Sequence, residues 1–238
     1  MILLRPRLWA LLCLALVTSA WTAAGPPPAA AAPCPLSEIQ FNLGPVVTSG
    51  LAAFDTSLSA DERLAFDLVA GTLLLRHPNF ELVGNSSTHV RASDAFDVVG
   101  VTPGTPVSLV AEFSVDGAVW TPACGGSGCW GNLFISIAQG GVSATQYAQV
   151  NIFTGQPPRP VHLVARLPVE LVAGQPVVLD FLIAGSESAG GNHFVIGGGA
   201  YRFVEAPPGV VVVSCQGYAA GSTPARAASW GRVKATYR

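Results

Sequence analysis

Lysine is almost absent from this sequence, and Lys234 is the only one among 238 residues. Charged residues make up 11% of the chain, and 12 basic against 14 acidic residues give a formal net charge of -2 at pH 7. Nucleic-acid binding depends on clustered Lys and Arg that displace counterions from phosphates, so this composition excludes nucleic acid as a partner. A shortage of lysine beside abundant Ala, Gly, Val and Arg is typical of a high-GC bacterial coding bias.

Motifs that carry catalysis or bind metals are also missing. The histidines lie apart, with neither His-x-His nor His-Glu-x-x-His spacing; they are His77, His89, His162 and His193. Residues 185–190, GSESAG, miss the Gly-x-Ser-x-Gly elbow by one residue and are predicted to form a flexible turn. No EF-hand spacing is present. The sequence therefore predicts no catalytic centre, no metal site and no cofactor.

The N-terminal segment has the pattern of a secretory signal peptide. A short positive region with Arg5 and Arg7 precedes an apolar stretch at residues 8–17, which is shorter than the roughly 20 residues of a transmembrane helix. We expect residues 1–24 to be removed and residues 25–33 to be a disordered Pro/Ala leader, because proline fixes φ and lacks an N–H donor. Pro33 argues against lipid attachment at the cysteine that follows it, so we expect a secreted protein, extracellular or periplasmic, without a membrane anchor.

Four cysteines remain after Cys13 leaves with the signal peptide. Export places them in an oxidising compartment, where disulfides persist. Cys124 and Cys129 enclose only GGSG, a flexible loop that lets their side chains meet, so we predict a disulfide between them. By elimination Cys34 pairs with Cys215. Redox chemistry at the close pair and a four-cysteine zinc site are weaker alternatives, because they favour Cys-x-x-Cys at a helix start and two closely spaced pairs, respectively.

Apolar and polar residues alternate through most of the chain, which is the period of a β-strand. Within residues 107–115 only Val110 breaks this alternation. The period returns at residues 133–137, so Trp120 and Trp130 are predicted to flank the tip of a β-hairpin. Further strands are predicted at residues 148–152, 161–167, 177–183, 201–203 and 210–213, with turn sequences such as PGTP, AGQP and PPG between strands.

Residues 59–71, SADERLAFDLVAG, offer the one helical alternative, because Ser59 and Glu62 fit a capping box. The segment is short and precedes the strand-like TLLLR, so helix is the minority interpretation. Many short strands separated by turns predict two packed antiparallel sheets. The predicted fold is therefore an all-β antiparallel β-sandwich, jelly-roll or immunoglobulin-like and disulfide-stabilised, formed by residues 34–238 as a single domain.

Three stretches resemble a known group of proteins. They are DAFDVVGVTPGTPVSLVAEFSVDG at residues 94–117, GAYRFVEAPPGVVVVSCQGY at 199–218 and PARAASWGRVKATYR at 224–238. Their strand and turn patterns, with SCQGY and SWGRVKATYR, are similar to uncharacterised secreted bacterial β-sandwich proteins, including exported domains of proteins that carry a C-terminal Pro-Glu-Pro sorting signal. That sorting signal is absent here. The resemblance implies a sandwich fold and extracellular placement, but no activity and no site residues.

Aromatic residues are more specific candidates for ligand binding than the carboxylates, because many exported β-sandwiches stack sugar rings on exposed Trp or Tyr. The candidates are Trp120, Trp130 and Trp230, together with Tyr147 and Tyr218. Large aromatic residues also dominate protein cores, so each of them taken alone is more often a core residue.

Paired carboxylates are the candidates for glycoside hydrolysis or calcium binding. The pairs are Asp94 with Asp97, Asp61 with Glu62, and Glu112 with Asp180. Each also fits a turn or a solvent-facing strand position. The leading prediction is a secreted, non-catalytic β-sandwich that acts as an extracellular binding or structural module, with a glycan or cell-surface polymer as candidate partner. A carbohydrate-binding or calcium-assisted adhesion module is the alternative, and a glycosidase-like enzyme is third.

Overall fold

The computed structural model describes residues 33–41, 45–57, 63–79, 86–124, 129–152, 156–188 and 191–221. All strands belong to the compact unit Cys34–Arg238. Within the described ranges, no helix is long and apolar enough to cross a membrane. In chain order the strands are β1 (Ser37–Gln40), β2 (Val47–Ser49), β3 (Ala53–Ser57), β4 (Arg63–Asp67), β5 (Thr72–Asn79), β6 (Ser86–Val99), β7 (Pro106–Cys124), β8 (Cys129–Gln139), β9 (Val142–Ile152), β10 (Arg159–Val172), β11 (Val177–Ser188), β12 (Gly191–Val204), β13 (Val211–Ser214) and β14 (Ala219–Gly221).

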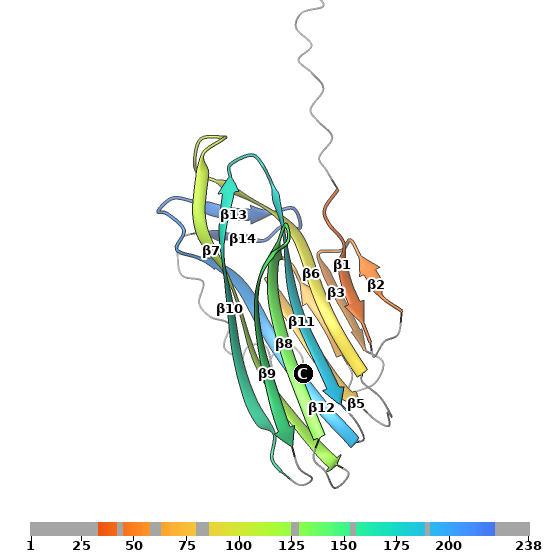
Figure 1. Ribbon diagram of the computed structural model, residues 1–238. Helices are drawn as coiled ribbons and strands as arrows, with labels where there is room; N and C mark the ends of the chain where they lie inside the picture. The colour runs from red at the N-terminus through yellow and green to blue at the C-terminus, as the bar shows by residue number, and fades with distance from the viewer. Residues whose placement is uncertain are drawn as a thin grey trace, which may run out of the picture. The chain divides into compact units, whose positions relative to one another are not determined.

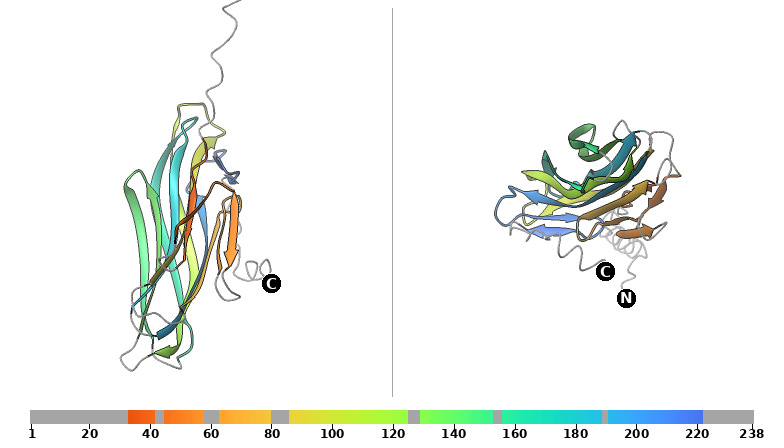
Figure 2. Two further views of the ribbon diagram at one scale, coloured as in Figure 1. Left: turned by 90° about the vertical axis from the view of Figure 1, so that its right-hand side faces the viewer. Right: turned by 90° about the horizontal axis from the view of Figure 1, so that it is seen from below.

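The strands form two antiparallel sheets that pack face to face (Figure 1). One sheet has eight strands in the order β14-β13-β6-β11-β8-β9, with β1 paired to β6 and β2 paired to β1. The other has six strands in the order β10-β7-β12-β5-β4-β3. Seen from below in Figure 2, the two sheets lie as stacked layers. The predicted all-β sandwich is therefore confirmed, and the order of its strands is now defined.

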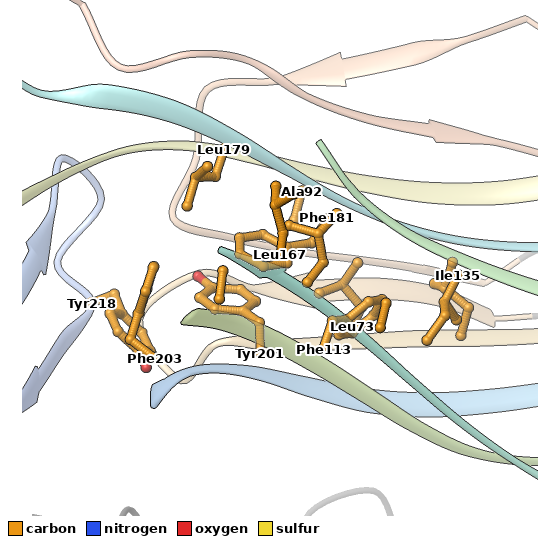
Figure 3. Close-up of a cluster of buried hydrophobic side chains, with 14 of the residues drawn as sticks. Leu73, Ala92, Phe113, Ile135, Leu167, Leu179, Phe181, Tyr201, Phe203 and Tyr218 are labelled. Atoms are coloured by element: carbon orange, nitrogen blue, oxygen red, sulfur yellow. The ribbon is translucent and has the colours of Figure 1, made fainter. Parts of the chain in front are cut away.

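Side chains that point between the layers form the core. Along β10, buried residues alternate with more exposed ones from Val161 to Val172, as the period of two requires. Phe181 from the eight-stranded sheet stacks on Tyr201 from the six-stranded sheet, with ring centroids 4.0 Å apart and an interplanar angle of 12° (Figure 3). Phe96 packs edge-on against both rings. Aromatic packing thus joins the two layers.

The connection between β7 and β8 is not the predicted hairpin. β7 pairs with β10 and β12 in the six-stranded sheet, whereas β8 pairs with β11 and β9 in the eight-stranded sheet. The chain passes from one sheet to the other between these strands, so Trp120 and Trp130 belong to different sheets. Alternation specifies which side chains face the core, but it leaves the partner strand undefined. A hairpin and a sheet-to-sheet connection therefore share the same sequence pattern.

Two shorter segments also differ from alternatives drawn from the sequence. Residues 63–67 form strand β4, which excludes the helix there, and the chain then turns at Gly71, whose φ is +67°. Residues 58–62 lie outside the described part. Residues 185–188 were predicted as part of a flexible turn, but they continue β11. Residues 185–187 pair with both β6 and β8, and Ser188 pairs with β8. A Gly/Ser-rich sequence is accepted in this strand because neighbouring strands flank it on both sides.

The predicted disulfide between Cys34 and Cys215 is present, with Cα atoms 5.7 Å apart and a sequence separation of 181 residues. It joins the segment before β1 to the residue that follows β13. The side chains of Cys124 and Cys129, at the ends of β7 and β8, lie outside the described residues. Their pairing remains a prediction.

Candidate functional site

A pocket of about 460 Å³ lies on the outer face of the eight-stranded sheet. Its volume falls in the range of about 300–1,000 Å³ that is typical of small-molecule sites. The lining comes from β1, β6, β8 and β11 and combines charged, hydroxyl and small apolar side chains. These are Glu38, His89, Arg91, Ser136, Ala138, Asp180, Leu182 and Ala184.

Strand register explains why these side chains share one face. Glu38 lies opposite Arg91, Arg91 lies opposite Leu182, and Leu182 lies opposite Ser136, so four strands contribute to one row. Successive side chains of a strand point to opposite faces, so residues two positions away join the same surface. On β6 the same rule turns Val90 into the core.

Arg91 holds two carboxylates in the pocket. Its Nη2 donates to Asp180 Oδ2 at 2.8 Å, and its Nη1 lies 3.5 Å from Glu38 Oε2. Ser93 Oγ donates to the other oxygen of Asp180 at 2.5 Å. The hydrogen bond to Asp180 raises the pKa of Arg91, whereas burial lowers the pKa of His89 below its usual value of 6.5. At neutral pH the pocket therefore contains one cation, two anions and an uncharged imidazole.

Three aromatic side chains lie on the same outer face beside the pocket. Phe134 on β8 lies opposite Tyr147 on β9, and Trp130 precedes Phe134 by four residues and so shares its face. Tyr147 is 72% exposed and Trp130 is 42% exposed, while Phe134 is half-buried. With a strand rise of about 3.4 Å per residue, Trp130 lies about 14 Å along β8 from the Phe134–Tyr147 row.

The aromatic candidates from the sequence separate into three groups. Trp130 and Tyr147 come together on the surface just described. Tyr218 is a core residue, which is the more common role expected of each aromatic taken alone, and burial raises its pKa to about 12. It is therefore not a surface platform. The backbone of Trp120 lies in the six-stranded sheet, but its side chain lies outside the described residues, as does all of Trp230.

None of the described carboxylate pairs from the sequence forms a site. Glu112 lies on the outer face of the six-stranded sheet, between Arg166 and Arg202, while Asp180 lies on the outer face of the other sheet. An odd spacing of three residues along β6 turns Asp94 and Asp97 to opposite faces of the strand. The pair Asp61 and Glu62 lies outside the described residues.

Metal binding finds no support in the same regions. Within the described ranges, no group of three or more His, Cys, Asp or Glu is placed to hold a metal ion. Asp94 Oδ1 accepts hydrogen bonds from the backbone N–H groups of Ala95 and Gln216, and Asp97 Oδ1 accepts from those of Val98 and Gly174. Both carboxylates therefore accept hydrogen bonds from neighbouring backbone N–H groups.

The sequence analysis did not predict the cluster around Arg91. Its members nevertheless occupy outward-facing positions on strands in which buried and exposed side chains alternate. In residues 89–93, HVRAS, the odd positions His89, Arg91 and Ser93 face outward while Val90 and Ala92 face inward. This alternation was visible in the sequence. The assembly of Glu38, Arg91 and Asp180 depends on the pairings of β1 with β6 and of β6 with β11, which join segments about 50 and 90 residues apart.

The fold has distant structural similarity to carbohydrate-binding modules. One such module, solved in complex with beta-1,4-galactotriose, has 11% sequence identity and a TM-score of 0.25, and the match covers 63% of this chain and 81% of that chain. Another structure, of modules with promiscuous specificity from the β-sandwich superfamily, has 9% identity and a TM-score of 0.27, covering 72% and 86%. At these TM-scores the likeness carries no inference about function. No protein-family model matches the chain, and no curated protein matches it.

Proposed function

We propose that this chain is a secreted, non-catalytic carbohydrate-binding protein whose glycan lies across the outer face of the eight-stranded sheet. The observation that carries the proposal is the common face shared by Tyr147, Trp130 and the polar pocket at Arg91. A sugar makes two kinds of contact with a protein, stacking on aromatic rings and hydrogen bonds to polar groups. This face offers exposed aromatic rings on β8 and β9 and charged hydrogen-bonding groups in the pocket.

Each kind of contact has a clear physical role. Aromatic rings have large apolar faces, and the exposed rings of Tyr147 and Trp130 offer them to the C–H faces of sugar rings. Carboxylate and guanidinium groups make hydrogen bonds roughly twice as strong as those between neutral groups, and sugar hydroxyls both donate and accept. The distance of about 14 Å between Trp130 and the Phe134–Tyr147 row, which follows from the strand rise, favours an oligosaccharide over a single sugar.

Two features of the structure support the proposal that the protein is non-catalytic and secreted. Glycosidases place two carboxyl groups on either side of the scissile bond, with space between them for the sugar and often a water. In the pocket, the guanidinium of Arg91 lies between Glu38 and Asp180 and pairs with both, which supports binding without catalysis. The disulfide between Cys34 and Cys215 supports export, because disulfides persist in oxidising compartments.

A glycan array probed with the purified protein tests the proposal, followed by calorimetry on the tightest oligosaccharide. We expect saturable binding, and Tyr147→Ala and Trp130→Ala should each weaken it about tenfold, which corresponds to about 1.4 kcal/mol. Val69→Ala is the control, because Val69 is 53% exposed in the turn after β4 and lies away from the pocket face. Silence across the array, or equal affinity in all three variants, would refute the proposal. Release of new reducing ends would replace it with an enzymatic function.

A further inference from the structure

The pocket contains more negative than positive charge. Glu38 and Asp180 contribute two carboxylates, and Arg91 contributes the one guanidinium. Because burial lowers the pKa of His89, this imidazole adds no positive charge at neutral pH. One cation and two anions leave a formal net charge of −1 in the part of the surface where a sugar would bind.

Among the residues that the structure describes, the strands beside the pocket add no further cation. β8 (CWGNLFISIAQ) and β9 (VSATQYAQVNI) contain no charged residue, so the aromatic part of the face is uncharged. Arg166 and Arg202 pair with Glu112 on the opposite sheet. Charges separated by more than about 8 Å of water are largely screened at physiological salt, so those two arginines add little attraction for an anion in the pocket.

Arg91 is also held by groups that an incoming anion would have to displace. Asp180 accepts from Nη2 of Arg91 and from Ser93 Oγ, so its carboxylate is anchored from two sides. A sugar carboxylate or sulfate that approached the guanidinium would meet the charges of Asp180 and Glu38 at close range. A sugar hydroxyl meets no such repulsion, since it donates to the carboxylates and accepts from the free N–H groups of the guanidinium.

From this arrangement we infer that the pocket selects an uncharged sugar residue and rejects uronates and sulfated sugars. This inference rests on the proposed carbohydrate-binding function and specifies its ligand class. Ala138, Leu182 and Ala184 provide apolar contacts in the same pocket, which suits a neutral ring with hydroxyl groups at its edge. A discrimination of about tenfold or more against the matched anionic sugar is expected from one unfavourable charge contact.

The experiment uses an array that contains neutral, uronate and sulfated oligosaccharides in equal numbers. The expected result is that the bound glycans are neutral and that Tyr147→Ala weakens their binding about tenfold. Uronate or sulfated glycans among the tightest ligands, with binding again weakened in Tyr147→Ala, would overturn the charge selection while leaving the proposed function intact. Silence with every glycan would overturn both.

A charge variant then tests the cause of the selection. The probe is the tightest neutral oligosaccharide and its C6-oxidised uronate form, which differ by one carboxylate per oxidised residue. Glu38→Gln removes one anion and should raise the affinity for the uronate form severalfold, with a smaller change for the neutral form. Asp55→Asn is the matched control, since Asp55 also pairs with an arginine, Arg63, but lies on β3 of the other sheet. An unchanged ratio of the two affinities in Glu38→Gln, measured on a variant with the parent's melting temperature, would overturn the inference.

Discussion

Cys34 and Cys215 are joined although they lie 181 positions apart in the sequence, and the bond fixes two strands on the same edge of β6. β1, which follows Cys34, pairs with β6 around Arg91, and β13, which precedes Cys215, pairs with the far end of β6 around Val98. The backbone N–H of Cys215 also donates to the carbonyl of Ala95 on β6. The disulfide therefore supports one margin of the sheet that carries the pocket.

Replacing both cysteines, Cys34→Ser with Cys215→Ser, should lower the free energy of unfolding by up to about 5 kcal/mol. In the chain-entropy model, the closure of so long a loop removes much of the conformational freedom of the unfolded chain. Chemical unfolding monitored by circular dichroism measures the effect. Reductant should destabilise the parent far more than the double variant, and an equal unfolding midpoint for parent and variant would contradict the prediction.

Glu112 should stabilise the protein above acidic pH. Its side chain is buried and its two oxygens pair with Arg166 and Arg202 on the neighbouring strands. Burial by itself raises the pKa of Glu112, but the hydrogen bonds from Arg202 and Arg166 outweigh it, so the pKa is lowered from its usual 4.5. A lowered folded-state pKa gives stability that is present above the unfolded-state pKa and is lost as the pH falls through the folded-state value.

We expect Glu112→Gln to cost about 1–3 kcal/mol at neutral pH, because the new amide NH₂ group faces one of the two guanidinium groups. The free energies of unfolding of parent and variant should converge as the pH falls through the lowered folded-state pKa of Glu112, where the parent's carboxyl becomes protonated. Denaturant titrations at neutral and acidic pH measure this difference. A loss of stability that stays constant over this pH range would show that the ion pairs contribute nothing.

The two-sheet architecture followed from alternation alone, and its connections did not. The alternation in residues 107–115 predicted a half-buried strand, and these residues lie in β7. A strand that buries one face and exposes the other requires a period of two residues. Trp120 and Trp130 were predicted to flank one hairpin, but they lie in different sheets. The alternation of the two strands is the same for a hairpin and for a connection that crosses to the other sheet, so it could not distinguish them. Trp130 and Tyr147 were recognisable as aromatic candidates. Their companions Arg91 and Glu38 were not, because their meeting depends on long-range register that no local pattern specifies.

Asp94 should show the opposite pH dependence from Glu112. It is 1% exposed, its Oδ2 has no hydrogen-bond partner, and desolvation raises its pKa above the usual 3.8 in spite of hydrogen bonds from Ser214, Ala95 and Gln216. A raised folded-state pKa for an acid gives stability that is present below the unfolded-state pKa and is lost as the pH rises through the folded-state value. The ionised carboxylate therefore lowers stability at neutral pH.

We expect Asp94→Asn to unfold at a higher denaturant concentration than the parent at neutral pH, because the amide oxygen keeps the acceptor while the buried charge disappears. The gain should vanish below the usual pKa of 3.8, where the parent's Asp94 is also uncharged. Asp97→Asn, on the other face of β6, is the control and should give no such gain. Asp94→Asn that is less stable than the parent at neutral pH would show that the hydrogen bonds of the ionised form outweigh desolvation.

Gly199 and Gly197 face the core from β12, and they should differ in their tolerance of a methyl group. A Cβ on Gly199 would meet Val115 Cγ2, lie 2.5 Å from the carbonyl oxygen of Ser114 and lie 3.0 Å from Phe113 Cε2. That backbone oxygen belongs to β7, which is held by ladders on both sides, so β7 cannot move away without breaking pairs. Gly199→Ala should therefore cost about 1–3 kcal/mol in free energy of unfolding, the usual range for overpacking.

Gly197→Ala is the matched comparison on the same strand. Its Cβ would lie 2.7 Å from Ile183 Cδ1 and 3.1 Å from Leu133 Cδ1, both of which are ends of flexible side chains from the opposite sheet. Because these methyl groups move by rotation about side-chain bonds and leave the backbone in place, the cost should be smaller than for Gly199→Ala. Denaturant unfolding of both variants measures the order of their stabilities. The reverse order would mean that the distance between the layers, and not the backbone of β7, limits the packing at this point of the sandwich.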